Sequence, residues 1–243
     1  MLISTQNMLA AARRSGYAVG AFNIYNLEGA LAVTRAAEEL DSPVILQILP
    51  SALAISGTAL IHACLETGRS ALVPVSVHLD HCSDETLIRT ALKAGISSVM
   101  ADGSMLGFED NLAFTRKMAE LADGYDAGVE AELGRIAGSE DGLTVDLLKA
   151  FEAINMQFAE PARPAALAVC IGNIHGKYPF EPHLDFDRLE QIAGAVAIPL
   201  VLHGTSGLPD AMIRRAVELG VCKFNVNTEV RTIYLDQLSN LFR

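Results

Sequence analysis

The chain has 243 residues, of which 51% are hydrophobic and 19% charged, and its formal net charge is −11. This length and composition predict one large domain with a core of its own. The negative charge argues against nucleic acid or an anionic membrane surface as a partner, because both need a basic footprint. No apolar run approaches the ~18–20 residues that span a bilayer.

The amino terminus and the cysteines indicate the compartment. The amino terminus lacks a basic segment followed by a long apolar core, so no signal peptide is indicated. The cysteines form no C-x-x-C pair and no disulfide framework, which favours free thiols in a reducing compartment. We therefore expect a cytoplasmic protein. The four cysteines are Cys64, Cys82, Cys170 and Cys222.

Eight short apolar runs rich in β-branched residues punctuate the sequence. Their near-continuous apolarity is typical of strands covered on both faces, as in a parallel sheet. The runs span residues 17–24, 43–49, 74–81, 97–102, 128–134, 166–172, 199–204 and 223–228.

Segments with helical periodicity separate most of these runs, the clearest being residues 26–40, 84–94, 107–124 and 209–219. Eight alternations of strand and helix predict a TIM (β/α)8 barrel rather than an open doubly wound sheet. No linker or repeat interrupts residues 1–243, so a single domain is expected. Residues 143–164 fit no element clearly, and a last helix from near Glu229 has barely the length to close the barrel.

Ionisable residues follow the third, sixth and seventh runs. Asp80 and His81 end the third run, His175 follows the sixth, and His203 stands near the end of the seventh. In a TIM barrel the carboxyl ends of the strands carry the chemistry. Histidine and carboxylate ligands without cysteine suit zinc or a similar divalent ion, and three protein ligands would leave a position open for substrate. Polar residues at other strand ends are Asn23, Asp102, Glu132, Asn225 and Thr228.

Glycine-rich turns follow two of these histidines. Gly176 comes after His175, and residues 203–207 read His-Gly-Thr-Ser-Gly and lead into a helix near Pro209. Glycine allows close approach of a ligand to the backbone, whose amide groups can hold a phosphate. The second of these turns follows the seventh strand, where TIM barrels commonly bind phosphate.

Five motifs in chain order resemble the class II, metal-dependent ketose-bisphosphate aldolases. They lie at residues 78–81, 130–141, 171–176, 202–207 and 223–229, and residues 14–23 are also similar. The resemblance runs from about Thr5 to the end. It implies a lyase of carbohydrate metabolism, such as glycolysis, that reversibly cleaves fructose or tagatose 1,6-bisphosphate. The products would be dihydroxyacetone phosphate and an aldehyde phosphate, through an enediolate that zinc stabilises.

The resemblance also implies roles for single residues. Zinc would be held by the three strand-end histidines, while Asp80 would protonate or polarise the aldehyde carbonyl. Glu140, on a loop after the fifth strand, would exchange the proton at the carbon that forms the bond. Asp102 and Glu132 match positions at which the family binds a second divalent metal or holds the metal in an alternative location. They could instead be carboxylates that only form hydrogen bonds. A monovalent cation is also expected as a possible cofactor. The substrate would be bound by Asn23, Gly176, Gly204, Ser206, Gly207, Asn225 and Thr228.

Other ionisable residues are predicted to have supporting roles and no part in the chemistry. His78 is interpreted as a supporting histidine, and Glu130 as a structural or solvated carboxylate. A Schiff-base mechanism is disfavoured, because Lys223 begins its strand at the wrong end and Lys177 is read as a charge on the rim of the barrel.

Two alternatives to this aldolase remain. A metal-dependent hydrolase would need a His-x-His pair at the end of the first strand, where residues 21–23 read Ala-Phe-Asn. A non-catalytic barrel that binds metal and sugar phosphate as an interaction or regulatory domain is also considered, because relatives continue well past the position of Arg243. The chain is therefore expected to be a fragment or to have an incomplete site. The expected partners are a small sugar phosphate and further copies of the chain, in a dimer or tetramer.

Overall fold

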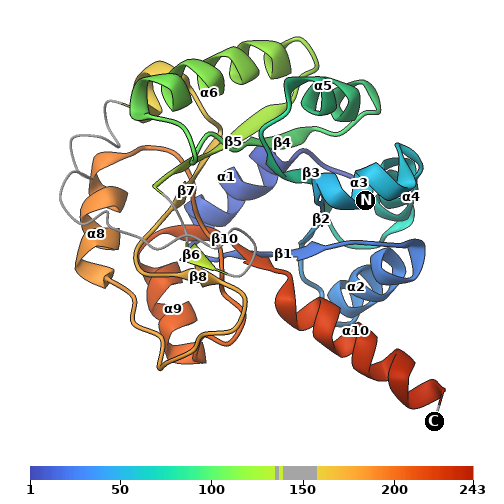
Figure 1. Ribbon diagram of the computed structural model, residues 1–243. Coiled ribbons are helices and arrows are strands. Elements are labelled where there is room, and N and C mark those ends of the chain that lie inside the picture. Colours follow the sequence, from blue (N-terminus) through green and yellow to red (C-terminus); the bar gives the residue numbers. More distant parts are fainter. Residues whose placement is uncertain (135–136, 139–157, 243) are drawn as a thin grey trace.

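The computed structural model describes residues 1–134, 137–138 and 158–242, and within them eight parallel strands form a closed barrel (Figure 1). The strands follow chain order around the ring, and the last pairs with the first. All eight predicted strands and the predicted TIM barrel are thus confirmed. The barrel strands are β1 (Val19–Asn23), β2 (Val44–Ile48), β3 (Val75–Cys82), β4 (Ser98–Ala101), β5 (Gly128–Leu133), β7 (Ala166–Val169), β9 (Leu200–Leu202) and β10 (Val221–Val226).

Helices surround the barrel and include the four predicted most clearly, α2, α5, α6 and α9. Local chemistry sets their starts: the side chain of Asp84 accepts the amide hydrogens of Thr86 and Leu87 at the first turn of α5. Residues 143–164 lie largely outside the described part of the chain. The helices are α1 (Thr5–Ser15), α2 (Leu27–Glu39), α3 (Pro50–Ser56), α4 (Ala59–Ser70), α5 (Glu85–Lys93), α6 (Phe108–Asp123), α8 (Phe186–Ala195), α9 (Asp210–Glu218) and α10 (Thr228–Leu241).

The helix α1 supports one end of the barrel. Its buried side chains Met8, Leu9 and Ala12 pack with Ala166 of β7 and Ile45 of β2 in one apolar cluster. Figure 1 shows α1 inside the outline of the ring of strands. Because this cluster contains residues that begin the strands, the opposite, carboxyl-terminal end of the barrel is left for polar groups.

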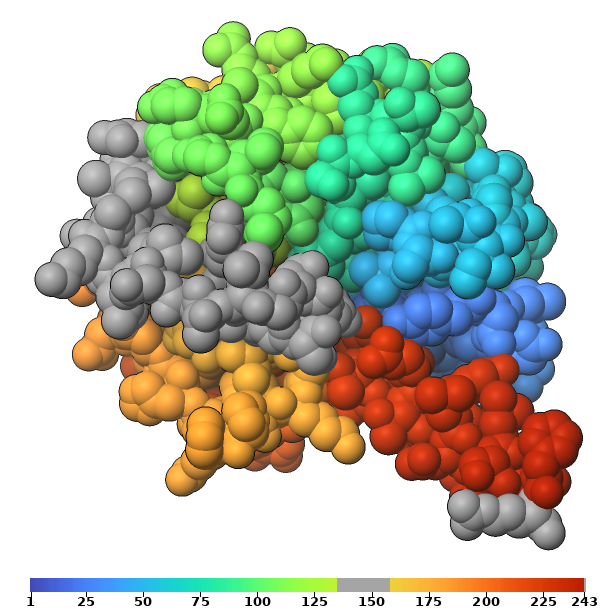
Figure 2. Space-filling view, in the orientation of Figure 1, coloured from blue at the N-terminus to red at the C-terminus, as the bar shows by residue number. Residues whose placement is uncertain are grey.

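The helix α10 extends away from the barrel, where Figures 1 and 2 show it in red. None of its described residues is buried, although Asn26 donates a hydrogen bond to the Tyr234 hydroxyl at 2.8 Å near its first turns. The last predicted helix, from near Glu229, is thus confirmed, and it is the pairing of β10 with β1 that closes the barrel. Of the helices that the structure describes, none has the length and apolarity to cross a membrane.

A second, two-stranded sheet lies outside the barrel. It pairs β6 (Ala137–Gly138) with β8 (Ile174–His175) in parallel. The sixth apolar run therefore ends earlier than expected, at Val169, and the chain turns through Gly172, which has φ 98°, before β8 begins. His175 is delivered by this short extra strand and does not stand at the end of a barrel strand.

Candidate metal and substrate site

A β-bulge near the end of β3 directs Asp80 and His81 into the same cavity. Alternation along a regular strand would point these neighbours to opposite faces. The register of β3 against β4 shifts between Leu79 and Cys82, and His81 has φ 45°, a left-handed conformation that is uncommon outside glycine. Both side chains consequently line one pocket at the carboxyl end of the barrel.

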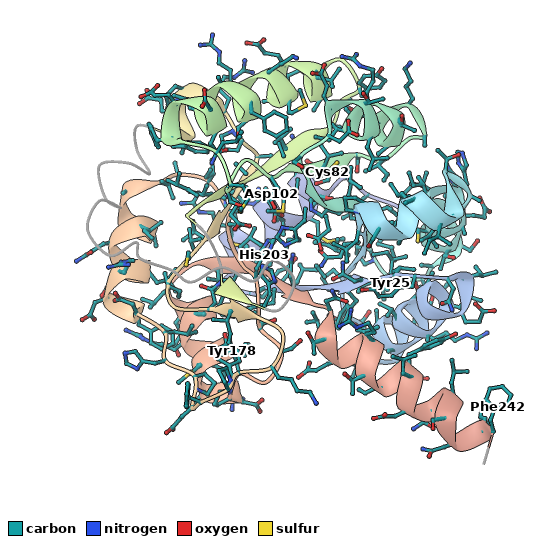
Figure 3. The ribbon with its side chains drawn as sticks, viewed as in Figure 1. Tyr25, Cys82, Asp102, Tyr178, His203 and Phe242 are labelled. Atoms are coloured by element: carbon teal, nitrogen blue, oxygen red, sulfur yellow. The ribbon has the colours of Figure 1, made fainter. Side chains whose placement is uncertain are left out.

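Three imidazoles converge at this end of the barrel. His81, His175 and His203 each offer a ring nitrogen, and these nitrogens lie within 4.8 Å of one another. Two of them, His81 Nε2 and His203 Nδ1, lie 2.9 Å apart. Figure 3 shows His203 near the centre of the ring of strands. The three histidines that the sequence singles out are thus brought together.

Carboxylates hold the outer nitrogens of two of these rings. His81 Nδ1 donates to Asp102 Oδ2 at 2.8 Å, and His203 Nε2 donates to Glu130 Oε1 at 2.8 Å. Burial would raise the pKa of Asp102, but hydrogen bonds from His81 and Ser104 hold it well below its usual range. Of the two readings given for Glu130, structural or solvated, the solvated one is wrong, because its side chain is buried.

The facing nitrogens of His81 and His203 require a cation between them. If both rings are neutral and their outer N–H groups go to carboxylates, two lone pairs face each other at 2.9 Å. Burial lowers the pKa of His81, but the charge of Asp80, the hydrogen bond to Asp102 and the charge of Glu132 together raise it to about 10. Burial and the charge on His81 lower the pKa of His203 well below its ordinary value. The surroundings of these two nitrogens thus favour a positive charge, which a metal ion would supply.

Glu132 adds a second group of possible ligands. Its Oε2 is buried, has no hydrogen-bond partner in the described part of the chain, and lies 3.9 Å from His81 Nδ1 and 4.0 Å from His203 Nδ1. Burial first, and then the charge of Asp102, raise the pKa of Glu132 well above its usual range. A buried oxygen without a partner costs free energy that a cation would offset. His81, Asp102 and Glu132 also bring three ligand atoms within 4.8 Å of one another. The residues present fit a divalent cation.

Two amides fix the carboxylate of Asp80. Asn23 Nδ2 donates to Asp80 Oδ2 at 2.9 Å and Asn225 Nδ2 donates to Oδ1 at 3.1 Å. Gln47 Nε2 in turn donates to Asn23 Oδ1 at 2.9 Å. The sequence analysis missed Gln47, although it is the single polar residue in the apolar strand β2 and is fully buried.

A tight contact between loops places His175 beside His203. Gly204 has φ 62°, and a Cβ atom there would lie 2.1 Å from the Ile174 carbonyl oxygen. Two further groups join these loops: Asn173 Nδ2 donates to the His203 carbonyl oxygen at 3.0 Å, and the Tyr178 hydroxyl donates to that of Gly204 at 2.8 Å. Neither Asn173 nor Tyr178 was singled out from the sequence.

Most predicted substrate residues line the same pocket as Asp80. Gly207 lies outside it, in a neighbouring groove that shares Ser206 and Thr228 with the pocket, and its amide donates to Glu229 Oε1 at 3.1 Å. Glu140 lies outside the described residues. The pocket is lined by Asn23, Asp80, His81, His175, Gly176, Gly204, Ser206, Asn225, Asn227 and Thr228.

The remaining candidates lie outside the pocket. His78 is buried with its Nδ1 2.8 Å from Ser98 Oγ, and it does not belong to the histidine cluster. Lys223 is fully buried, and its Nζ donates to Glu130 Oε2 at 2.8 Å, so its amine is already in an ion pair. Lys177 is exposed beside the pocket mouth.

Comparison with known proteins gives consistent matches over the whole chain. The sequence model of the family described as class-II fructose-bisphosphate aldolase matches residues 3–242. The chain is 47% identical over 245 residues to the D-tagatose-1,6-bisphosphate aldolase subunit GatY of Klebsiella oxytoca, an alignment that covers 99% of this chain and 86% of that protein.

Solved structures agree with this match. The YdjI aldolase from Escherichia coli K12 is similar with a TM-score of 0.88 and 33% identity, covering 99% of this chain and 87% of that one. The fructose-bisphosphate aldolase of Campylobacter jejuni has a TM-score of 0.82 over 98% of this chain and 81% of that one; at 24% identity it shows the fold alone.

Proposed function

The chain belongs to the class-II fructose-bisphosphate aldolase family, and from this membership we infer that it cleaves the C3–C4 bond of a ketose bisphosphate, giving dihydroxyacetone phosphate and an aldehyde. The observation that carries this inference is the convergence of His81, His175 and His203 beside the fixed carboxylate of Asp80. The comparisons give no support to a non-catalytic barrel.

Zinc is the metal that we propose for the three imidazoles. Three nitrogen ligands with an open position are typical of catalytic zinc sites. Bound there, zinc would act as a Lewis acid for the negative charge that develops on the ketose oxygens. Asp102 and Glu132 would offer a second or alternative location for a cation, as the unpartnered Glu132 oxygen supports.

Asp80 is proposed to move the proton of the aldehyde oxygen. In cleavage, the C4 hydroxyl loses its proton to an Asp80 oxygen as the C3–C4 bond breaks and its electron pair passes to C3. In synthesis the same group returns the proton. Asn23 and Asn225 hold both carboxylate oxygens, so the group is oriented before substrate arrives. Glu140 is proposed to exchange the proton at C3.

The ketose phosphate is proposed to bind at the glycine-rich loops and the start of α10. Asn227 leaves the first amides of α10 without a side-chain cap, and the positive end of a helix attracts a phosphate. Gly204 provides a backbone surface that a Cβ atom would block. The proposed phosphate-binding residues are Gly176, Gly204, Ser206, Gly207, Asn225 and Thr228.

Tagatose 1,6-bisphosphate is the substrate we propose first, because the relative at 47% identity is named for it. The test is a comparison of kcat/KM for tagatose and fructose 1,6-bisphosphates with purified, zinc-loaded protein. A higher kcat/KM for the tagatose compound supports the proposal, and a preference for fructose 1,6-bisphosphate contradicts it. The two sugars differ in the configuration of one hydroxyl, so the ratio reports contacts to that group.

The chain is also proposed to form a homo-oligomer, a dimer or tetramer. The similar protein of Klebsiella oxytoca is named a subunit, and α10 exposes Ile233, Leu235 and Leu241, followed by the exposed Phe242. Light scattering after size-exclusion chromatography gives the mass, and a monomer across concentrations would contradict the proposal. None of the four cysteines forms a disulfide and all are buried, which supports a cytoplasmic location.

A further inference from the structure

A buried ion pair crosses the interior of the barrel beneath the histidine cluster. Lys223 of β10 donates to Glu130 Oε2 of β5 at 2.8 Å, and the two side chains are 0% and 2% exposed. Strands β7 and β9 separate the two partners in the ring. Burying two charges costs free energy, and apolar residues of similar volume in place of such a pair are often neutral or stabilising. Fold stability alone therefore gives a weak reason for this pair.

The other oxygen of Glu130 reaches the histidine cluster. Glu130 Oε1 accepts the hydrogen bond of His203 Nε2 at 2.8 Å, so this nitrogen carries the proton of the neutral ring. His203 Nδ1 is then left as the lone-pair nitrogen, and it is this atom that lies 2.9 Å from His81 Nε2. Glu130 thus selects which nitrogen of His203 faces the cluster.

Each side of the carboxylate has a defined partner. Lys223 holds Oε2, and Oε1 is directed at His203; a second buried imidazole, His78, has its Nε2 3.7 Å from Oε2. Without the lysine, the carboxylate would be an unpaired buried charge. The lysine is therefore needed for Glu130 to act as an acceptor toward His203.

We propose that Glu130 and Lys223 are positioning residues for the metal site: Lys223 anchors the Glu130 carboxylate, and Glu130 fixes His203 as the Nε2–H tautomer with Nδ1 directed at the metal. The proposal rests on the proposed function in that His203 is taken as a zinc ligand. A carboxylate that orients a ligating histidine contributes about 10- to 100-fold to metal affinity.

Two double variants separate positioning from stability. Glu130→Gln with Lys223→Met removes both charges and keeps an oxygen that can accept from His203. Glu130→Leu with Lys223→Met removes both charges and the acceptor. Both avoid the unpaired buried charge that either charge removal alone would create. Denaturant unfolding of the metal-free proteins checks that the two variants are folded.

The readout is the zinc dissociation constant, measured by competition with a coloured chelator. The proposal predicts binding about 10- to 100-fold weaker in the leucine variant than in the glutamine variant. Equal zinc affinities in the two folded variants would overturn it. If Glu130 and Lys223 only stabilised the barrel, leucine and glutamine at position 130 would give the same zinc affinity.

A second measurement is made on metal-free wild-type protein, with one variant used only to assign the signals. Nitrogen NMR of histidine-labelled, metal-free wild-type protein distinguishes the two neutral tautomers, and the His203 signals are assigned by their loss in His203→Gln. The proposal predicts the Nε2–H tautomer for His203, and the Nδ1–H tautomer would overturn it. This result is independent of the proposed function, which fails instead if the wild-type protein binds no zinc or cleaves no ketose bisphosphate.

Discussion

Replacing Asp80 with alanine should separate carbon–carbon cleavage from metal binding. The change removes the group proposed to move the aldehyde proton, and such groups contribute about 10²- to 10⁴-fold. We therefore expect kcat for cleavage to fall by about that factor. Zinc affinity should stay within a few-fold, because the three imidazoles that hold the metal are unchanged.

The structure also indicates how much unfolding free energy Asp80→Ala should lose. Asp80 accepts from Asn23 at 2.9 Å and from Asn225 at 3.1 Å, and hydrogen bonds to a charged group are worth about 1.5–3 kcal/mol each. The pocket that Asp80 lines has room for water, which can accept from the amide groups of Asn23 and Asn225 once the carboxylate is gone. Both amide groups thus find other partners, so we expect a net loss of about 1–3 kcal/mol, which leaves the protein folded.

Two assays on Asp80→Ala test this reasoning. Cleavage is followed by enzymatic reduction of the dihydroxyacetone phosphate released. Exchange of the C3 proton of dihydroxyacetone phosphate in heavy water is followed by NMR, and it should survive because Glu140 is predicted to carry it. If exchange falls by the same factor as cleavage, or if cleavage remains within tenfold of the wild-type rate, the role assigned to Asp80 is refuted.

Three further changes probe the metal ligands, the loop contact and the thiols. His81→Ala should weaken zinc binding, measured by chelator competition, by more than about 100-fold. This exceeds the effect of removing a residue that only hydrogen-bonds to a metal ligand, and retained affinity would contradict the ligand assignment. Gly204→Ala should lower both the unfolding free energy in urea and kcat/KM, since its Cβ would meet the Ile174 oxygen at 2.1 Å. Gly16 is also left-handed, but a Cβ there would lie in open space, so the control Gly16→Ala should lower the unfolding free energy by only about 1–2 kcal/mol and leave kcat/KM unchanged. Equal losses of unfolding free energy in the two variants would contradict the loop contact. Burial raises the pKa of Cys64 to about 12, so a thiol reagent at neutral pH should modify the four buried cysteines only as the protein unfolds.

The barrel could be predicted because its signal is local. Each strand buried on both faces leaves a continuous apolar run in the sequence, and β2, β4, β5, β7 and β9 are buried along their whole length. The helix α4 was missed although Leu60 and Cys64, and Ile61 and Leu65, repeat at the spacing of one helix face. Gln47 could also have been recognised from the sequence, as a single polar residue within an apolar strand.

Other features of the site depend on contacts between distant parts of the chain. The bulge that turns His81 toward Asp80 arises from the pairing of β3 with β4, which no single run contains. The pairing of Glu130 with Lys223 joins residues 93 positions apart across the barrel. Strand β8, which delivers His175, exists only because it pairs with β6. Residue type alone therefore identifies the ligands, whereas their orientation requires the fold.

Metal-dependent cleavage of a ketose bisphosphate is the central activity proposed for this chain. The decisive measurement is the cleavage rate before chelation, after thorough metal removal and after addition of zinc, with a parallel sample treated with borohydride and substrate. We expect the rate to vanish on metal removal, to return with zinc, and to be unaffected by borohydride, because Lys223 is already paired with Glu130. Activity that survives metal removal, or that borohydride with substrate abolishes, would contradict the account.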